Sequence, residues 1–260
     1  MPEQGALVNV LVCVKRVPLT GGKMVLTEDE RAISTRHLGF TVSPHEECAA
    51  EEAVRLVEHH GGSSTVLTLG PPEAEQQLRD MMAIGIERGV HLETSGEEWD
   101  PQATAAAIVA AVRAEAEPFD LLLFGNESAD AGNYQVAVRV GYALGLPIVT
   151  GIKALSLEAD RKRLRCEQEI PGGRDIYLVP PPAVVSVKEG INLPRYPSVP
   201  GRLRAKRKPV AASAPGRSDP RLEMVRLMTP PGSGKQAQLL GRGPEAAPAV
   251  VSVLGELGLM

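Results

Sequence analysis

The sequence predicts an α/β fold with a doubly wound, mostly parallel sheet, to which an antiparallel hairpin excursion and a C-terminal arm are attached. Continuous apolar, β-rich runs such as residues 8–14 are typical of strands buried on both faces of a parallel sheet. These runs alternate with segments of helical periodicity, the pattern of a parallel sheet with right-handed crossovers. Hairpin-type strands then follow, and residues beyond 210 show no comparable pattern.

The chain of 260 residues, 43% of them apolar, can fill the core of one large domain. We expect residues 1–210 to form the α/β domain. Residues 211–220, AASAPGRSDP, have the composition of a linker, and a short apolar segment near the C-terminus has no place in a complete sheet. Residues 211–260 are therefore expected to be a linker and an arm that packs on a partner.

Charge and cysteine content narrow the class of protein. A net charge of -4 gives no general attraction to nucleic acid or to an acidic membrane. No apolar run approaches the roughly 20 residues that span a bilayer. Cys13, Cys48 and Cys166 are far apart in sequence, and no signal peptide is recognisable. We expect a soluble, cytoplasmic protein with no membrane insertion and no nucleic-acid partner.

The first half of the chain contains the alternating elements. Residues 8–14 form the first strand, and residues 18–40 are irregular, as in a small hairpin or lid. Ser43, followed by Pro44 and by Glu46 three positions later, predicts a helix that starts with a capping box. The next elements are a strand at 64–69, a helix at 73–84, a strand within 85–92, a helix at 101–115 and a strand at 121–124.

After Pro147 the pattern changes to hairpin strands. These strands are expected at residues 148–157, 164–170 and 175–179, before a final buried run at 183–187.

Residues 120–136, DLLLFGNESADAGNYQV, read as strand, loop and helix start. A loop at the carboxyl end of a parallel strand, feeding a helix whose first amides lack partners, is where open α/β sheets bind phosphate. Gly125, Gly132 and Asn133 suit such a loop, although any turn between strand and helix contains small residues. The fold class is therefore Rossmann-like, and this loop is the candidate site for a phosphate or a nucleotide.

Other local patterns in the sequence do not predict a functional site. The segment 231–235, PGSGK, ends like a phosphate-binding loop, but Thr229 stands where that pattern requires glycine and Gln236 where it requires Ser or Thr. His59 and His60 lie near a helix end and predict no metal site. The basic run 202–208 lacks stacking aromatics. We predict no catalytic residue and no metal site.

Several segments together resemble one family. VNVLVCVKRVP (8–18), SPHEECAAEEAVRL (43–56), TLGP (68–71), DLLLFGNESADAGNYQV (120–136) and the segment PAVVSVKEGINLPRYPSVPGRLRAKRKP (182–209) resemble, in order and spacing, the β subunit of electron transfer flavoprotein. The resemblance covers residues 7–210. It implies an electron carrier that is not itself an enzyme, paired as a heterodimer with an α subunit that holds most of the FAD. The heterodimer would carry electrons from dehydrogenases, such as acyl-CoA dehydrogenases, to a quinone-reducing oxidoreductase.

The resemblance also implies a buried structural AMP and assigns residues to it. Thr20 and His45 would lie near the flavin. The chain departs from the family at Ser43, where Asn is usual, and at His45, where Tyr or Phe is usual. In flavin-bifurcating relatives the same pocket takes a second FAD, an alternative that stays open, although we expect one FAD and one AMP. The AMP residues are Cys13, Ser43, His45, Glu46, Leu69, Gly125, Asp130, Gly132, Asn133, Tyr134, Gln135 and Val136.

The loop GINLPRYPS is expected to dock the dehydrogenase, with Ile191 as an exposed apolar anchor because Gly190 and Pro194 place it in a loop. An alternative of another class is a self-sufficient nucleotide-binding or nucleotide-hydrolysing domain, which would need no partner and no apolar arm. The docking residues are Ile191, Asn192, Leu193, Pro194, Arg195 and Tyr196.

Overall fold

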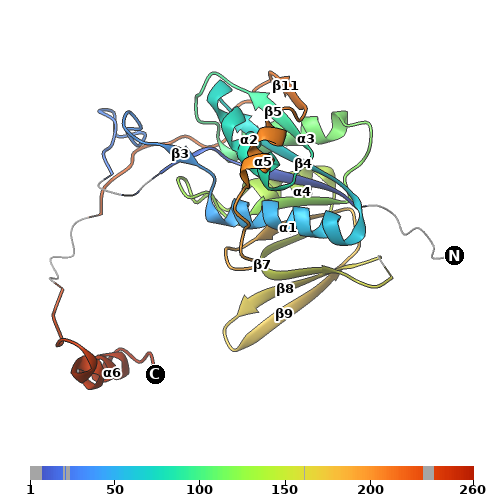
Figure 1. Ribbon diagram of the computed structural model, residues 1–260. Coiled ribbons are helices and arrows are strands. Elements are labelled where there is room, and N and C mark those ends of the chain that lie inside the picture. Colours follow the sequence, from blue (N-terminus) through green and yellow to red (C-terminus); the bar gives the residue numbers. More distant parts are fainter. Residues whose placement is uncertain (1–7, 20, 22–23, 161, 231–236) are drawn as a thin grey trace.

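The computed structural model describes residues 8–19, 21, 24–160, 162–230 and 237–260 (Figure 1). Thr20 and the segment 231–235 lie outside these residues. Nine strands form one sheet in the order β11-β5-β4-β1-β6-β10-β7-β8-β9, and every neighbouring pair from β11 to β7 is parallel. The strands are β1 (Val8–Val14), β4 (Gly62–Gly70), β5 (Arg88–Glu93), β6 (Leu121–Gly125), β7 (Ile148–Leu157), β8 (Leu164–Ile170), β9 (Gly173–Val179), β10 (Ala183–Val187) and β11 (Val210–Ser213).

Helices cover both faces of the parallel strands, which confirms the doubly wound prediction. Along β1, Val10 and Val12 pack in one buried cluster with α1 and α2, whereas Leu11 and Cys13 pack in a second cluster with α3 and α4. Alternate side chains thus point to opposite helical layers, which is why the buried part of the strand, residues 10–14, is apolar. The helices are α1 (Pro44–His60), η1 (Pro72–Ala74), α2 (Glu75–Ile84), α3 (Pro101–Ala114), α4 (Val136–Leu144), α5 (Val199–Ala205), η2 (Pro244–Ala246) and α6 (Ala247–Glu256).

The antiparallel excursion is confirmed. Strand β8 pairs antiparallel with both β7 and β9, and these strands lie below α1 in Figure 1. A second small sheet joins β2 (Val17–Pro18) to β3 (Phe40–Thr41), which are also antiparallel. The hairpin expected between residues 18 and 40 is therefore present.

One boundary differs from the sequence prediction. Strand β11 pairs with β5 at the edge of the sheet, so the sheet is not complete by residue 210 and includes residues up to Ser213. Its four residues, VAAS, show no alternation of apolar and polar types, so periodicity does not identify a strand. Helix α4 begins at Val136, so residues 133–135 belong to the loop.

The arm leaves the domain after Ser213. Its first part is held by Asp100, whose Oδ2 accepts the N–H groups of Arg221 and Leu222 (2.8 and 3.1 Å), and by Arg217, which pairs with Glu97 (2.6 Å). Helix α6 contains no buried residue and stands apart from the sheet in Figure 1. Among the described residues no helix is long and apolar enough to cross a membrane.

Candidate functional site

The site is centred where the order of strand addition reverses. From β1 the chain adds β4 and β5 on one side, and it later adds β6 and β10 on the other side. In open α/β sheets the crevice at the carboxyl ends of strands beside this switch point is the ligand site. Cys13 of β1 lies opposite Phe124 of β6, so Lys15 and Gly125 emerge at the same edge.

The start of α1 closes against this edge through Glu46. The carboxylate of Glu46 accepts the N–H of Lys15 (3.1 Å) and the N–H of Ser43 (3.3 Å), so the predicted capping residue also ties the helix to the end of β1. Burial raises the pKa of Glu46 to about 8, although the two backbone donors oppose that shift. A Cβ at Gly125 would lie 2.6 Å from Cγ of Glu46, so glycine is required here by close packing.

The loop between β6 and α4 is fixed at two points. The hydroxyl of Ser43 accepts the N–H of Ala129 (2.9 Å), and Lys15 Nζ lies 2.8 Å from Asp130 and 2.6 Å from Glu98. Burial disfavours the charged form of Lys15, but the two carboxylates outweigh burial and raise its pKa. Burial opposes ionisation of Asp130 as well, and Lys15 nevertheless lowers its pKa. The contacts hold the loop over the end of β1.

The same loop ends in a backbone arrangement suited to an anion. Gly132 and Tyr134 have positive φ angles of 55° and 56°, and the latter is uncommon for a residue other than glycine. The first helical hydrogen bond of α4 runs from the N–H of Arg139 to the oxygen of Gln135 (3.0 Å). The N–H groups of residues 136–138 therefore lack a partner within the helix and can bind an anion.

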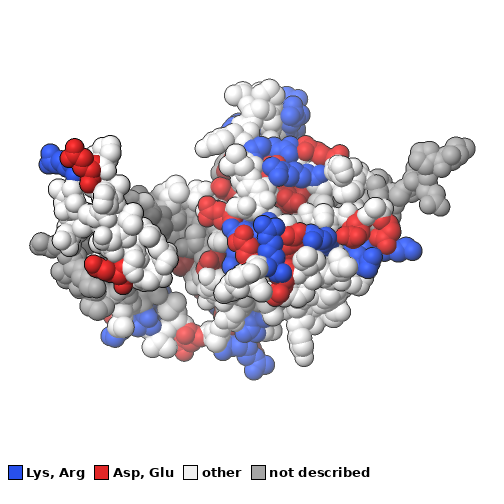
Figure 2. Space-filling view, turned by 90° about the horizontal axis from the view of Figure 1, so that it is seen from below, with Lys and Arg blue, Asp and Glu red and all other residues white. Residues whose placement is uncertain are grey.

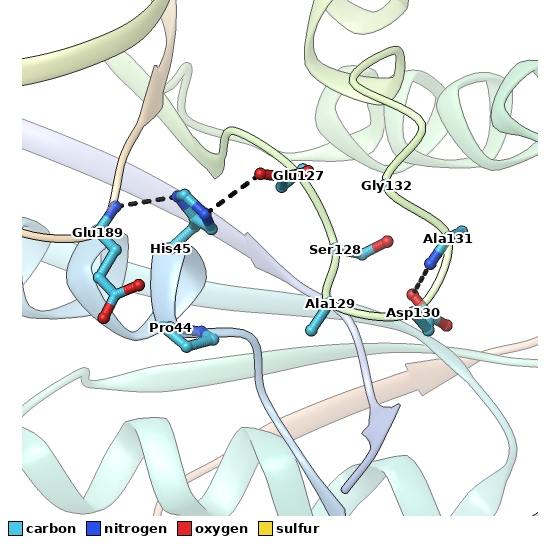
Figure 3. Close-up of a pocket in the computed structure, with 9 residues that line it drawn as sticks. All are labelled: Pro44, His45, Glu127, Ser128, Ala129, Asp130, Ala131, Gly132 and Glu189. Carbon is cyan, nitrogen blue, oxygen red and sulfur yellow. Dashed lines mark hydrogen bonds and ion pairs between the residues drawn. The ribbon is translucent and has the colours of Figure 1, made fainter. Parts of the chain in front are cut away.

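A hollow of about 370 Å³ lies beside this loop (Figure 3). His45 stands in it, where Nδ1 accepts the N–H of Glu189 (2.9 Å) and Nε2 lies 3.5 Å from Glu127. Glu127, Asp130 and Glu189 line the hollow with carboxylates, which accept hydrogen bonds but repel a phosphate. Its lining consists of Pro44, His45, Glu127, Ser128, Ala129, Asp130, Ala131, Gly132 and Glu189.

The structure brings the predicted AMP residues to one edge of the sheet but gives them different positions. His45, Asp130 and Gly132 line the hollow. Cys13, Ser43 and Glu46 are buried beneath it, and burial raises the pKa of the Cys13 thiol. Leu69, Gly125, Gln135 and Val136 are partly buried, whereas Asn133 and Tyr134 are exposed.

Sequence reasoning did not single out three charged residues of the site. Glu127 lies within the predicted loop and could have been found from its position. Lys15 directly follows the first strand, but nothing local shows that it pairs with Asp130. Glu189 reaches the hollow from the end of β10, 144 residues beyond His45, and the sequence contains no local indication of that contact.

In the loop predicted to dock a partner, Ile191 is partly buried and packs against the core cluster that includes α1. The expectation that Ile191 forms an exposed tip is therefore wrong, because the loop folds back on α1. The exposed apolar side chains of this loop are Leu193 and Tyr196, which are 84% and 96% exposed.

On the face drawn in Figure 2, the described residues form no extended basic area of the kind that binds nucleic acid. Figure 2 shows Lys and Arg interspersed with Asp and Glu on one face. No group of three His, Cys, Asp or Glu side chains within the described part of the chain could hold a metal ion.

Comparison with known proteins identifies the family. The family model described as "Electron transfer flavoprotein domain" matches residues 32–216. The chain is 31% identical to the electron transfer flavoprotein subunit beta of Bacillus subtilis, over 95% of this chain and 97% of that protein. It is 34% identical to the protein of that name from Syntrophomonas wolfei, over 86% of each chain, and 32% identical to the human one, over 81% and 83%. The chain belongs to the β subunits of the electron transfer flavoprotein family.

Proposed function

We propose that the chain is the β half of an electron carrier, which pairs with an FAD-binding α subunit, accepts electrons from dehydrogenases and passes them to a quinone-reducing oxidoreductase. The observation that carries this proposal is the arm. Helix α6 presents apolar side chains such as Val250 and Val251 but buries none of its residues. An apolar surface of this kind is stabilised by a partner, and for a member of this family that partner is the α subunit.

The crevice at the carboxyl ends of β1 and β6 is proposed to bind AMP. The partnerless N–H groups of residues 136–138 and the positive φ angles of the preceding loop fit a phosphate. The carboxylates in the hollow, those of Glu127, Asp130 and Glu189, can accept hydrogen bonds from ribose hydroxyls or an amino group. The residues present therefore fit a nucleotide with its phosphate toward α4.

A second FAD in this pocket is the alternative occupant, but one observation favours AMP. Both ring nitrogens of His45 are engaged, by Glu189 and by Glu127, and a flavin placed there would have to displace these contacts. We therefore expect one FAD, held mainly by the α subunit, and one AMP per heterodimer.

The loop of residues 189–198 is proposed to dock the dehydrogenase. Leu193 and Tyr196 are its exposed apolar side chains, and burying one of them in a partner contributes about 1.5–3 kcal/mol. Ile191 then supports the loop from beneath.

Co-expression with the flavin-binding α subunit tests the proposal. We expect a yellow heterodimer whose flavin is reduced by an acyl-CoA dehydrogenase and its substrate. A colourless chain that stays folded alone, binds or hydrolyses adenine nucleotide and ignores the α subunit would support the self-sufficient domain instead.

A further inference from the structure

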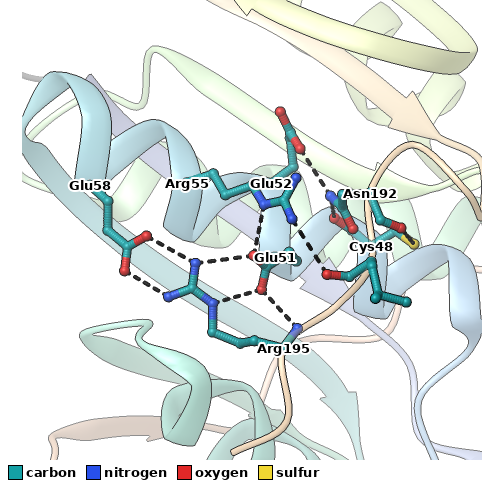
Figure 4. A network of polar contacts seen from close by, with 8 residues as sticks. Cys48, Glu51, Glu52, Arg55, Glu58, Asn192 and Arg195 are labelled. Carbon is teal, nitrogen blue, oxygen red and sulfur yellow. Dashed lines mark hydrogen bonds and ion pairs between the residues drawn. The ribbon is translucent and has the colours of Figure 1, made fainter.

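We propose that Glu51 and Glu58 of α1 form a carboxylate clamp that holds Arg195, and that Arg195 is thereby the positioning residue of the docking loop. The inference rests on the proposed docking role of residues 189–198. Glu51 and Glu58 share one face of α1 with Arg55, which lies four positions after Glu51 and three before Glu58 and donates to Glu51 (2.8 Å). That face is turned toward the loop (Figure 4).

The guanidinium of Arg195 is bound on two sides. Its Nε and Nη2 donate to the two carboxylate oxygens of Glu51 (2.9 and 3.0 Å), and its Nη1 and Nη2 donate to those of Glu58 (2.7 and 2.9 Å). The backbone N–H of Arg195 also donates to Glu51 (3.1 Å). Two bidentate pairs fix the plane of the guanidinium, a geometry that lysine cannot reproduce.

The clamp differs from an ordinary surface ion pair because Glu51 is buried, with a side chain 2% exposed. Burial opposes ionisation of Glu51, but hydrogen bonds from Arg195 and Arg55 outweigh burial and lower its pKa. A buried carboxylate is tolerated only where donors satisfy it, so Arg195 is confined to this position. The segment of loop that carries Arg195 is confined with it.

Further contacts secure the loop beside the clamp. The side-chain amide of Asn192 donates to the oxygen of Cys48 and to the carboxylate of Glu52 (both 2.9 Å). Arg55 donates to the oxygen of Leu193 (3.4 Å). The backbone on both sides of Leu193 is therefore attached to α1.

The contacts between the loop and α1 leave two apolar side chains of the loop exposed to solvent. Asn192 and Arg195 are bound to α1, whereas Leu193 and Tyr196, each next to one of them, are 84% and 96% exposed. A surface ordered before docking loses less conformational entropy when the partner binds. The clamp thus gives Leu193 and Tyr196 a fixed spacing, and a dehydrogenase with two matching apolar pockets is the partner that this surface fits.

The test uses the α/β heterodimer carrying Arg195→Gln, with Arg113→Gln as the matched control. Arg113 is an exposed arginine of α3, on the opposite layer, that donates to the oxygen of Ala143. Because Arg195→Gln leaves Glu51 without its main donor, Glu58→Gln is made as well. Glu58 is 57% exposed, so this change halves the clamp without leaving a buried charge.

Two quantities are measured: amide hydrogen exchange of residues 189–198, and KM for the heterodimer with the acyl-CoA dehydrogenase of the same organism that reduces the wild type fastest. For Arg195→Gln we expect faster exchange confined to the loop and about a tenfold rise in KM with turnover retained at saturation, a factor equal to about 1.4 kcal/mol. Glu58→Gln should give a smaller rise, and Arg195→Lys should restore less than half of the loss. The control, Arg113→Gln, should show the same loop exchange and the same KM as the wild type.

The results separate the clamp from the docking role. Faster exchange with an unchanged KM for both clamp variants, while Leu193→Ala raises KM, would overturn the inference and leave docking intact. A lower melting temperature with unchanged loop exchange would also overturn it, because the clamp would then only support α1. If neither Leu193→Ala nor Tyr196→Ala raises KM, the proposed docking role itself fails.

Discussion

Replacing Gly125 with alanine probes how α1, the nucleotide loop and β6 meet. The added Cβ would lie 2.6 Å from Cγ of Glu46, 3.0 Å from its backbone nitrogen and 3.1 Å from Cβ of His45. Unstrained carbon contacts are about 3.5–4.0 Å. Glu46 cannot swing aside freely, because its carboxylate is buried and holds the N–H groups of Lys15 and Ser43.

This crowding determines how much Gly125→Ala should lower the free energy of unfolding. Overpacking of a tight site destabilises by about 1–3 kcal/mol. The loss of chain freedom in the unfolded state offsets about 0.4–1 kcal/mol of that cost for a change from glycine to alanine. The net destabilisation should be about 1–2 kcal/mol, and at about 2–4 °C per kcal/mol it should lower Tm by about 2–8 °C. The first turn of α1 should also move away from the loop, so that Gly125→Ala loses bound AMP.

Thermal unfolding of the heterodimer, with nucleotide content measured on the same samples, provides the assay. Gly173→Ala is the matched control, because a Cβ at Gly173 meets nothing within 4 Å. The control should change stability by less than about 0.5 kcal/mol. If Gly125→Ala melted with the control and kept its AMP, the close approach of α1 to the loop would not be a feature of the folded protein.

Three more predictions concern the same edge of the sheet and the docking loop. Gly132→Asp should abolish AMP binding while FAD content is kept, because it adds strain at a φ of 55° and negative charge beside the phosphate site; released nucleotides would show this, and retained AMP would contradict it. Folding raises the pKa of Glu46 from 4.5 to about 8, so between these values the folded protein holds a proton that the unfolded chain releases. The stabilisation from this proton should be fully present below pH 4.5 and lost as pH rises through 8. The free energy of unfolding of the wild type, minus that of Glu46→Gln, should therefore fall as pH rises across this range. Tyr196→Ala should raise KM for the dehydrogenase about tenfold without changing Tm, whereas an earlier melting transition would mean that Tyr196 packs on its own chain.

The fold could be predicted from local patterns because its parallel strands are buried on both faces. Residues 10–14 and 121–124 had to be apolar, and Ser43 with Glu46 marked the start of α1. Strand β11 could not be predicted, because at the sheet edge only pairing with β5 makes those residues a strand. In general, buried elements leave a pattern in their own residues, and edge elements depend on their neighbours.

The candidate site shows the same division. The loop and the glycine at 125 followed from the position of the strand, but the reason for Gly125 is the packing of Glu46, which only the structure reveals. The orientation of Ile191 was not predictable either. A loop with Gly190 and Pro194 was expected to project its apolar residue, and the contacts of Asn192 and Arg195 with α1 turn Ile191 inward.

The most direct test of the nucleotide site is the stoichiometry of nucleotides released by heat from the purified heterodimer. The crevice between β1 and β6 should release one AMP alongside one FAD per heterodimer. Release of two FAD and no AMP would keep the crevice as a nucleotide site but assign it to a second flavin. Release of one FAD and no other adenine nucleotide would contradict the site.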